Sequence, residues 1–287
     1  MVGMRYTRPD VQKQFPNDGV CLKFIFDKRY GQLKTCPKCG VIGAKFYRIK
    51  KRMAFECRDC KHQIYPLKGT IFEKTTTPLT YWFEAIFLFS VSKNGVAALE
   101  LQRQIPVSYP TAHRMEKMIR LLMFEYERLG DLGTPVEVDE AFMIVNEKGR
   151  KGERTPVMAA LEVGGHVRTQ VIPKATSEHA VPFIEAYVRV GSMLHTDESK
   201  IYKTAKVKTF YDHDSVRHIG KEYVNKRGAT TNHVEGFFGQ FKRSLDGTYH
   251  SVSERYLASY AAEFSYRLNH RHEPIFQLLL AKAARRA

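Results

Sequence analysis

The sequence predicts an α/β protein in which a cysteine-rich module and a helical segment precede the main α/β domain. Three observations lead to this prediction. Four of the five cysteines form two CxxC pairs near the N-terminus, an apolar helical pattern begins at residue 79, and strand and helix patterns alternate beyond residue 134. A length of 287 residues suits about two domains. We place the segments at 15–70, 78–128 and 134–271.

Basic residues are concentrated at the N-terminal end of the chain. The whole sequence has 46 Lys and Arg against 30 Asp and Glu, a formal net charge of +16, and residues 1–70 alone hold 16 basic and 5 acidic residues. A composition with 43% hydrophobic and 26% charged residues excludes a disordered or low-complexity protein. A basic surplus confined to one end predicts a module that binds a polyanion.

No segment of the sequence resembles a membrane span. The most apolar stretch, 81–91, has 11 residues and contains Glu84, whereas a spanning helix needs about 20 residues. The first 15 residues carry charges where a signal peptide would be apolar. We therefore expect a soluble cytoplasmic protein without a membrane partner, whose cysteines are reduced rather than paired in disulfides.

The two CxxC pairs have the spacing of a zinc site. Seventeen residues separate the pair Cys36 and Cys39 from the pair Cys57 and Cys60, and each CxxC turn can present two thiolates to one tetrahedral ion. The intervening segment is long enough for a β-hairpin, which predicts a zinc ribbon. A redox dithiol would need only one pair. Cys21 lies outside both pairs and is interpreted as a small buried apolar residue.

The predicted hairpin carries a basic run, RIKKR, at 48–52. Such a run is often only a solvated face. On a strongly basic zinc ribbon it favours contact with nucleic acid, and the candidate DNA-binding residues are Arg48, Lys50, Lys51 and Arg52.

The middle segment has the pattern of a helix-turn-helix. An apolar helix over 79–94 is followed by a short helix from Ala97 to Arg103, a turn near Pro106, and a longer helix from about Tyr109. Periodicity alone also allows an ordinary helical hairpin. If the second helix enters a major groove, it would offer Ser108, Tyr109, Thr111, His113, Arg114 and Lys117, of which Arg114 and Lys117 are the charged candidates.

Beyond residue 134 the pattern predicts a mixed α/β domain. The predicted strands are 134–145, 154–163, 166–173, 192–199 and a short one at 209–214. The predicted helices are 177–188 with a Ser cap, 230–245, and a long amphipathic helix within 247–271.

Three carboxylates stand out by their positions in these elements. Asp139 follows the run Val136–Val138, Asp197 ends a second strand, and Glu235 lies in the first turns of a helix. Acids at the ends of adjacent strands and on a covering helix can converge on Mg²⁺, which prefers oxygen ligands. Two such ions can promote in-line phosphoryl transfer. The alternative is that the aspartates only terminate strands, since acids collect there.

The helix that carries Glu235 adds two candidates. Lys242 lies seven residues later, and Asn232 lies one turn earlier, so all three project from one face. A lysine two turns from a metal-binding carboxylate can hold a DNA phosphate without competing for the ion. A separation of seven residues is common by itself, however, on any exposed helix.

The motifs together resemble the ISXO-like group of insertion-sequence DDE transposases with an N-terminal zinc ribbon. The resemblance runs from about Phe15 to Arg271 and includes CPKCG, CRDC, VDEAF, HTDES and TNHVEGFFGQFKRSL. It implies a ribonuclease-H-like core, two Mg²⁺ ions held by Asp139, Asp197 and Glu235, and a bacterial, nucleoid-associated protein. Similar proteins use Asn or Glu at the third position, so Asn232 is the second choice there.

The resemblance also implies a reaction. The chain would bind the terminal inverted repeats of a mobile element, cut the strand at the element end, and join the freed 3′-hydroxyl to target DNA. Because an element has two ends, we expect a homodimer or a larger synaptic assembly. The alternatives are a non-catalytic zinc-ribbon and helix-turn-helix regulator, and a metal-dependent nuclease that cuts without joining.

Overall fold

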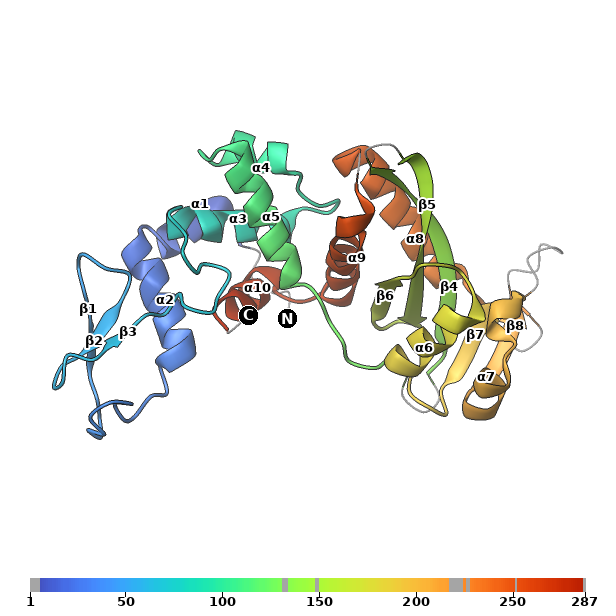
Figure 1. Cartoon of the computed structure of the whole chain (residues 1–287), viewed down its shortest axis with the longest axis horizontal. Coiled ribbons are helices and arrows are strands. Elements are labelled where there is room, and N and C mark those ends of the chain that lie inside the picture. The colour runs from blue at the N-terminus through green and yellow to red at the C-terminus, as the bar shows by residue number, and fades with distance from the viewer. Residues whose placement is uncertain are drawn as a thin grey trace. The chain divides into compact units, whose positions relative to one another are not determined.

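The computed structural model (Figure 1) describes residues 6–130, 134–147, 150–216, 224–225, 228–250 and 252–285. The chain divides into two compact units. The first consists of Met1–Ser92, Val96–Leu122 and His272–Ala287, and the second of Lys93–Gly95 and Met123–Arg271. Within the described residues, no helix is both long enough and apolar enough to span a membrane.

The first unit combines a small antiparallel sheet, in the order β1-β2-β3, with helices. Its elements are α1 (Arg8–Gln14), α2 (Asp18–Tyr30), β1 (Phe46–Arg48), β2 (Phe55–Cys57), β3 (Gln63–Ile64), α3 (Leu79–Val91), α4 (Ala98–Gln104), α5 (Tyr109–Leu121) and α10 (Ile275–Ala283).

Helix α3 lies at the centre of this unit. Its sequence is apolar nearly all round, which is typical of a helix buried on every side, and Trp82, Phe83 and Phe89 are almost inaccessible to solvent. The Phe83 ring packs edge-on against Phe15 with centroids 4.7 Å apart. The single charge in the apolar stretch, Glu84, is half-buried and is compensated by an ion pair with Arg8 of α1.

Helix α10 was not anticipated from the sequence. It follows the second unit in the chain, yet it packs on α3, where Phe276 meets Phe87 with ring centroids 5.8 Å apart. The first unit is therefore built from segments on both sides of the second unit in sequence.

The second unit contains a five-stranded sheet in the order β6-β5-β4-β7-β8. The strands are β4 (Val136–Glu147), β5 (Arg150–Glu162), β6 (Val167–Val171), β7 (Met193–Asp197) and β8 (Asp212–Val216). β4, β5 and β6 pair antiparallel, whereas β7 is parallel to β4 and to β8. The helices are α6 (Ser177–Tyr187), α7 (Ala205–Phe210), α8 (Asn232–Ser244) and α9 (Glu254–Asn269), with a 3₁₀ turn at Lys200–Tyr202 and a π turn at Leu245–Tyr249.

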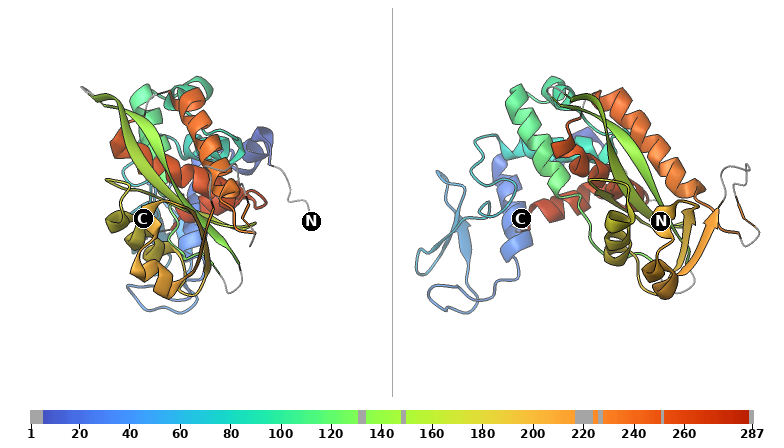
Figure 2. Two further views of the ribbon diagram at one scale, coloured as in Figure 1. Left: turned by 90° about the vertical axis from the view of Figure 1, so that its right-hand side faces the viewer. Right: turned by 45° about the vertical axis from the view of Figure 1, so that its right-hand side comes forward.

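The sheet is covered on both faces, and alternation along β4 decides which side chains face which cover. Ala141, Met143 and Val145 belong to a core shared with α8 and α9. Val136 and Val138 belong to a second core shared with α6 and α7. Figure 2 shows α8 running along β4 and β5. By this alternation, Asp139 is in phase with the residues that face α8.

Two of the predicted element limits were wrong, and one acid lies elsewhere in its strand than expected. β4 runs from Val136 to Glu147, close to the predicted 134–145, so Asp139 lies inside the strand and not at its end. Thr209 and Phe210 belong to the end of α7, which begins where the Thr204 hydroxyl accepts a hydrogen bond from the Val207 amide at 3.3 Å. The residue preceding α6 as its N-cap is Thr176 rather than Ser177.

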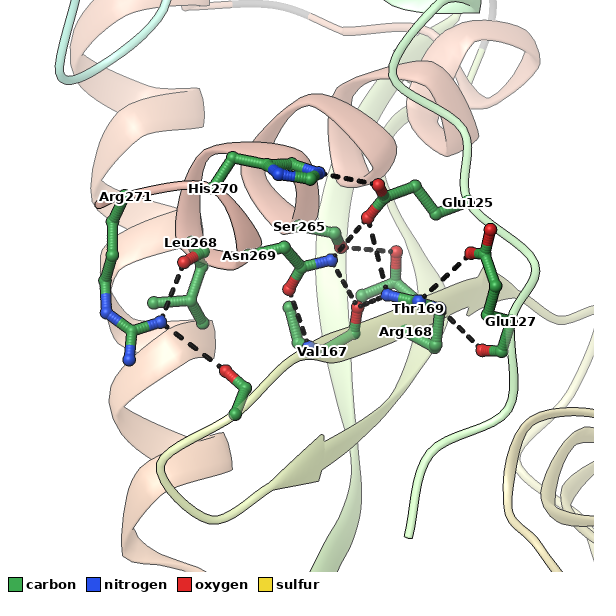
Figure 3. Close-up of polar contacts among 11 residues, drawn as sticks. Glu125, Glu127, Val167, Arg168, Thr169, Ser265, Leu268, Asn269, His270 and Arg271 are labelled. Atoms are coloured by element: carbon green, nitrogen blue, oxygen red, sulfur yellow. Dashed lines mark hydrogen bonds and ion pairs between the residues drawn. The ribbon is translucent and has the colours of Figure 1, made fainter. Parts of the chain in front are cut away.

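A buried polar network closes the β6 edge of the second unit (Figure 3). Arg168 of β6, only 4% exposed, donates to the Glu127 carbonyl oxygen at 2.9 Å and lies 3.4 Å from the Glu125 carboxylate. Asn269 and His270, at the end of α9, each contact Glu125 at 2.7 Å. The network therefore fastens the segment that follows α5 to the end of α9.

Candidate functional site

The four predicted zinc ligands lie together in the first unit. The Sγ atoms of Cys36, Cys39, Cys57 and Cys60 all lie within 4.8 Å of one another, and those of Cys36 and Cys60 are 3.7 Å apart. Four sulfurs at about 2.3 Å from a tetrahedral zinc ion would be spaced by about 3.8 Å. The donor set and its spacing thus fit a structural zinc ion, and the predicted four-cysteine cluster is confirmed.

The two cysteine turns are built alike. In each, the residue four positions after the first cysteine has a positive φ: 71° at Gly40 and 60° at Lys61. Each of these residues donates its N–H to the carbonyl oxygen of that first cysteine, over 3.0 Å to Cys36 and 3.1 Å to Cys57. The β1–β2 hairpin joins the two turns. Glycine adopts this conformation freely, whereas a lysine does so at some steric cost.

The fifth cysteine is not part of the cluster. Cys21 of α2 is fully buried, and burial raises the pKa of its thiol to about 12. A thiol that stays protonated neither binds metal nor attacks electrophiles at neutral pH, which agrees with its interpretation as an apolar core residue.

The candidate DNA-binding residues of the first unit are mostly exposed. Arg48, Lys50, Lys51 and Arg52 lie at the end of β1 and in the turn before β2, and all four are exposed. Arg52 donates to the Gln63 side chain at 3.2 Å. On α5, Arg114 is exposed and donates to the Glu73 carbonyl oxygen at 3.4 Å, whereas Lys117 is half-buried.

In the second unit, Asp139, Glu235 and Lys242 line one groove of about 600 Å³ between β4 and α8. Glu140, Phe142, Arg154 and Asp246 also line it. Asn232 is exposed at the start of α8 and is not among the lining residues. The structure thus brings Glu235, rather than Asn232, into the same groove as Asp139 and Lys242.

Asp139 and Asp197 lie on neighbouring parallel strands. The register of β4 with β7 pairs Val136 with Leu194 and Glu137 with His195, and these are the last paired residues. Asp139 and Asp197 each follow that last pair by two residues. The aspartates therefore occupy equivalent places where the parallel pairing stops, although β4 itself continues.

The electrostatics of this region are unfavourable to a negative charge. Burial raises the pKa of Asp139 to about 7, with further upward contributions from the charges of Glu140, Asp197 and Glu235. The Glu140 amide, which donates to Asp139 Oδ1 at 2.8 Å, opposes this shift. A bound cation would relieve the repulsion, and carboxylate oxygens are the donors that Mg²⁺ prefers.

The acids are less tightly grouped than the cysteines. Among the described residues, only the four cysteines form a group of three or more His, Cys, Asp or Glu side chains arranged to hold a metal ion. Asp197 Oδ1 accepts a hydrogen bond from the Ser199 amide at 2.9 Å, and Glu235 Oε1 accepts one from the Thr231 hydroxyl at 2.8 Å.

Two buried residues beside the acids were not predicted as site residues from the sequence. Glu137 is completely buried and contacts the first turn of α8. Tyr202 is also completely buried and donates to Glu140. Glu137 could have been noticed because it lies two residues before Asp139, in phase with it and between two valines. Nothing in the sequence near Tyr202 indicates its partner.

Fold and site together define a protein with a four-cysteine metal-binding module and an α/β domain that has an acidic groove. Comparison with known families identifies both parts. Residues 16–63 match the transposase zinc-ribbon domain, and residues 131–269 match the ISXO2-like transposase domain, both of the IS1595 type. The resemblance to the ISXO-like group of insertion-sequence transposases is therefore confirmed for these two regions.

One relative comes from a transposable element. The chain is 25% identical over 237 residues to the "Uncharacterized protein in transposable element ISH50" of Halobacterium salinarum, covering 74% of this chain and 78% of the relative.

Proposed function

We propose that this protein is a DNA transposase that binds the terminal inverted repeats of an insertion sequence and catalyses Mg²⁺-dependent strand cleavage and strand transfer. The observation that carries the proposal is the groove in which Asp139 and Glu235 accompany Lys242. Carboxylates on a surface that handles phosphodiesters weaken binding unless cations accompany them, whereas a lysine in the same groove can hold a phosphate.

The proposed catalytic core is ribonuclease-H-like. A five-stranded mixed sheet covered by helices on both faces supports it. Asp139 of β4, Asp197 of β7 and Glu235 of α8 are the proposed ligands of two Mg²⁺ ions, with Asn232 as the second choice for the third position. When bound, such ions activate the attacking oxygen and stabilise the leaving oxygen of an in-line displacement.

The protein's own residues then have separate tasks. The carboxylates would hold the cations, whose charge would offset that of the scissile phosphate. Lys242 contacts a phosphate further along the strand, two turns of α8 from Glu235. Cleavage leaves a 3′-hydroxyl at the element end, and the same groove aligns that hydroxyl with a phosphate of the target DNA. In cleavage a water oxygen displaces the 3′-oxygen from phosphorus, and in joining the freed 3′-hydroxyl displaces a 3′-oxygen of the target strand, so no covalent protein intermediate is needed.

The first unit is the proposed DNA-binding part. Its exposed basic turn, with Lys50 and Lys51, supplies phosphate contacts. α4 and α5, which contact each other, are proposed to act as a helix-turn-helix with Arg114 and Lys117 toward the DNA. Because the two ends of an element must be brought together, the proposal includes a homodimer or a larger synaptic assembly.

The decisive experiment uses DNA fragments that carry the ends of the element encoding this protein, as intact duplexes and as duplexes with a free 3′-hydroxyl at the end. Asp139→Asn and Asp197→Asn are each expected to abolish cleavage and joining in Mg²⁺ while leaving DNA binding intact. Asp246→Asn, at an exposed acid that lines the same groove, is the matched control and should retain both activities.

The three candidate functions give different results in this experiment. A non-catalytic regulator binds the ends with strong salt dependence but yields no product with any divalent ion. A nuclease cuts the intact duplex and never joins the free 3′-hydroxyl. Wild-type activity in either aspartate variant would show that the ligand assignment is wrong.

A further inference from the structure

Glu137 is a fully buried carboxylate that β4 places against the start of α8. Its Oε2 accepts the backbone N–H groups of His233 and Val234, each at 2.9 Å. Its Oε1 lies 2.7 Å from the His233 Nδ1. The Glu137 side chain is 0% exposed, whereas that of His233 is 52% exposed. A buried carboxylate is tolerated only when such donors satisfy it.

Glu137 takes the place of the usual side-chain cap of α8. An N-cap residue ordinarily accepts an N–H of the first turn with its own side chain. The N-cap of α8, Thr231, makes no such bond, because its hydroxyl donates instead to Glu235 Oε1 at 2.8 Å. Two first-turn amides, those of His233 and Val234, are thus satisfied from the sheet, and the Thr231 hydroxyl holds the Glu235 carboxylate instead.

This arrangement connects two of the three elements that carry the proposed metal ligands, β4 and α8. Glu137 and Asp139 lie two residues apart on one strand and are in phase, so they project from the same face. His233 and Val234 immediately precede Glu235. A carboxylate at a helix N-terminus is also favoured by the helix dipole. Glu137 therefore fixes the distance and orientation of the Glu235 turn relative to Asp139.

We infer that Glu137 is a positioning residue of the catalytic site, which sets the affinity for Mg²⁺ by holding the start of α8 on β4. This inference rests on the proposed function for its link to catalysis. The role requires a carboxylate, because two amide N–H groups and an imidazole N–H converge on it. Glutamine keeps one oxygen that could accept both backbone N–H groups, but its NH2 group would then face His233 Nδ1, so the imidazole has to change tautomer or move away.

The test compares Glu137→Gln with Glu263→Gln. Glu263 of α9 is equally buried in the same unit and is satisfied by Arg267 at 2.6 Å and Tyr249 at 3.0 Å, but it does not line the groove. Both variants are expected to lower the melting temperature. Only Glu137→Gln should raise the Mg²⁺ concentration for half-maximal cleavage, by about 10-fold or more, with most of kcat recovered at saturating Mg²⁺.

A second measurement requires no catalysis. Mg²⁺ binding is followed by calorimetry without DNA, and amide hydrogen exchange is measured at His233 and Val234. Glu137→Gln should weaken Mg²⁺ binding and speed exchange at these two amides, whereas Glu263→Gln should change neither. Equal Mg²⁺ midpoints and affinities for the two variants would overturn the inference. If wild type binds Mg²⁺ but forms no DNA product, the proposed function fails while the positioning role is still measured.

Discussion

The hydroxyl of Tyr202 donates a hydrogen bond to the carboxylate of Glu140, the residue next to Asp139 in β4. Consecutive strand residues point to opposite faces, so Glu140 turns toward the buried tyrosine while Asp139 is in phase with the residues that face α8. Both acids line the groove, but Glu140 is in addition hydrogen-bonded to the buried tyrosine, and this difference predicts different consequences of substitution.

Replacing Tyr202 with phenylalanine should affect stability more than catalysis. The variant leaves a half-buried carboxylate without its hydroxyl partner, and we expect the free energy of unfolding to fall by about 1–3 kcal/mol. Cleavage should stay within a few-fold of wild type. Urea unfolding and a cleavage assay measure the two effects. A loss of activity of 100-fold or more at unchanged stability would mean that Glu140 acts in the reaction.

Asp139→Asn should stabilise the metal-free protein at alkaline pH. Burial, followed by the charge of Glu140, raises the Asp139 pKa from its ordinary value of 3.8 to about 7. Because the folded chain binds this proton more tightly than the unfolded chain, ionisation destabilises the fold as pH rises from about 4 to about 7. Above pH 7 the ionised Asp139 lowers the free energy of unfolding by its full amount, at most about 4 kcal/mol.

Thermal unfolding in a chelating buffer checks this dependence. The melting temperature of Asp139→Asn should exceed that of wild type at pH 8, and the difference should shrink as the pH is lowered to 5. Adding Mg²⁺ at pH 8 should stabilise wild type and leave the variant nearly unchanged. A difference that is independent of pH would contradict a raised pKa at Asp139.

Zinc content should depend on the cluster cysteines and not on Cys21. Cys57→Ser removes a thiolate from the cluster, so we expect loss of the bound zinc and unfolding of the β1–β2 hairpin. Cys21→Ala, the matched control, should retain about one zinc per chain despite the cavity that it creates. Metal analysis of the purified proteins and hydrogen exchange across residues 36–60 measure both effects. Equal zinc content in both variants would refute the assignment of the ligands.

Removing the charges of Lys50 and Lys51 should weaken DNA binding uniformly across sequences. Each lost phosphate contact reduces the slope of log affinity against log salt by about 0.9, so the double alanine variant should lose close to two units of slope. The control is the double variant at Lys23 and Lys28 of α2, which has the same change in charge. Lys23 is already paired with Asp27 at 2.8 Å. An equal reduction of the salt slope in both double variants would indicate a general effect of net charge instead of specific phosphate contacts.

The elements that could be predicted from the sequence are those fixed by local pattern. The cysteine spacing alone predicted the cluster, because each CxxC turn is a local structure and the intervening length suits a hairpin. Periodicity likewise predicted α4, α5, α8 and most of the sheet. The short helix α7 was missed because its signal, a Thr204 cap before six residues, is weak beside the β-prone TFY at 209–211, which overlaps the end of the helix.

Contacts between residues far apart in the chain could not be predicted from the sequence. Glu137 is separated from His233 by 96 residues, and no local rule indicates that a strand residue caps a helix. The length of β4 was predicted closely, but Asp139 was expected at a strand end because an acid after three β-formers is typical of one. Here the parallel neighbour stops pairing after Glu137 while the antiparallel neighbour continues, and only the sheet topology reveals this difference.

Because α10 belongs to the first unit but follows the second unit in sequence, the first unit can finish folding only late in synthesis of the chain. Phe276 covers aromatic side chains of α3 that were made nearly 200 residues earlier, so the ribosome has completed the whole second unit before the first unit can close its core. A nascent or truncated chain that stops before residue 272 would present part of α3 to water. We expect such fragments to be captured by chaperones or proteases, so that only full-length translation yields a stably folded first unit.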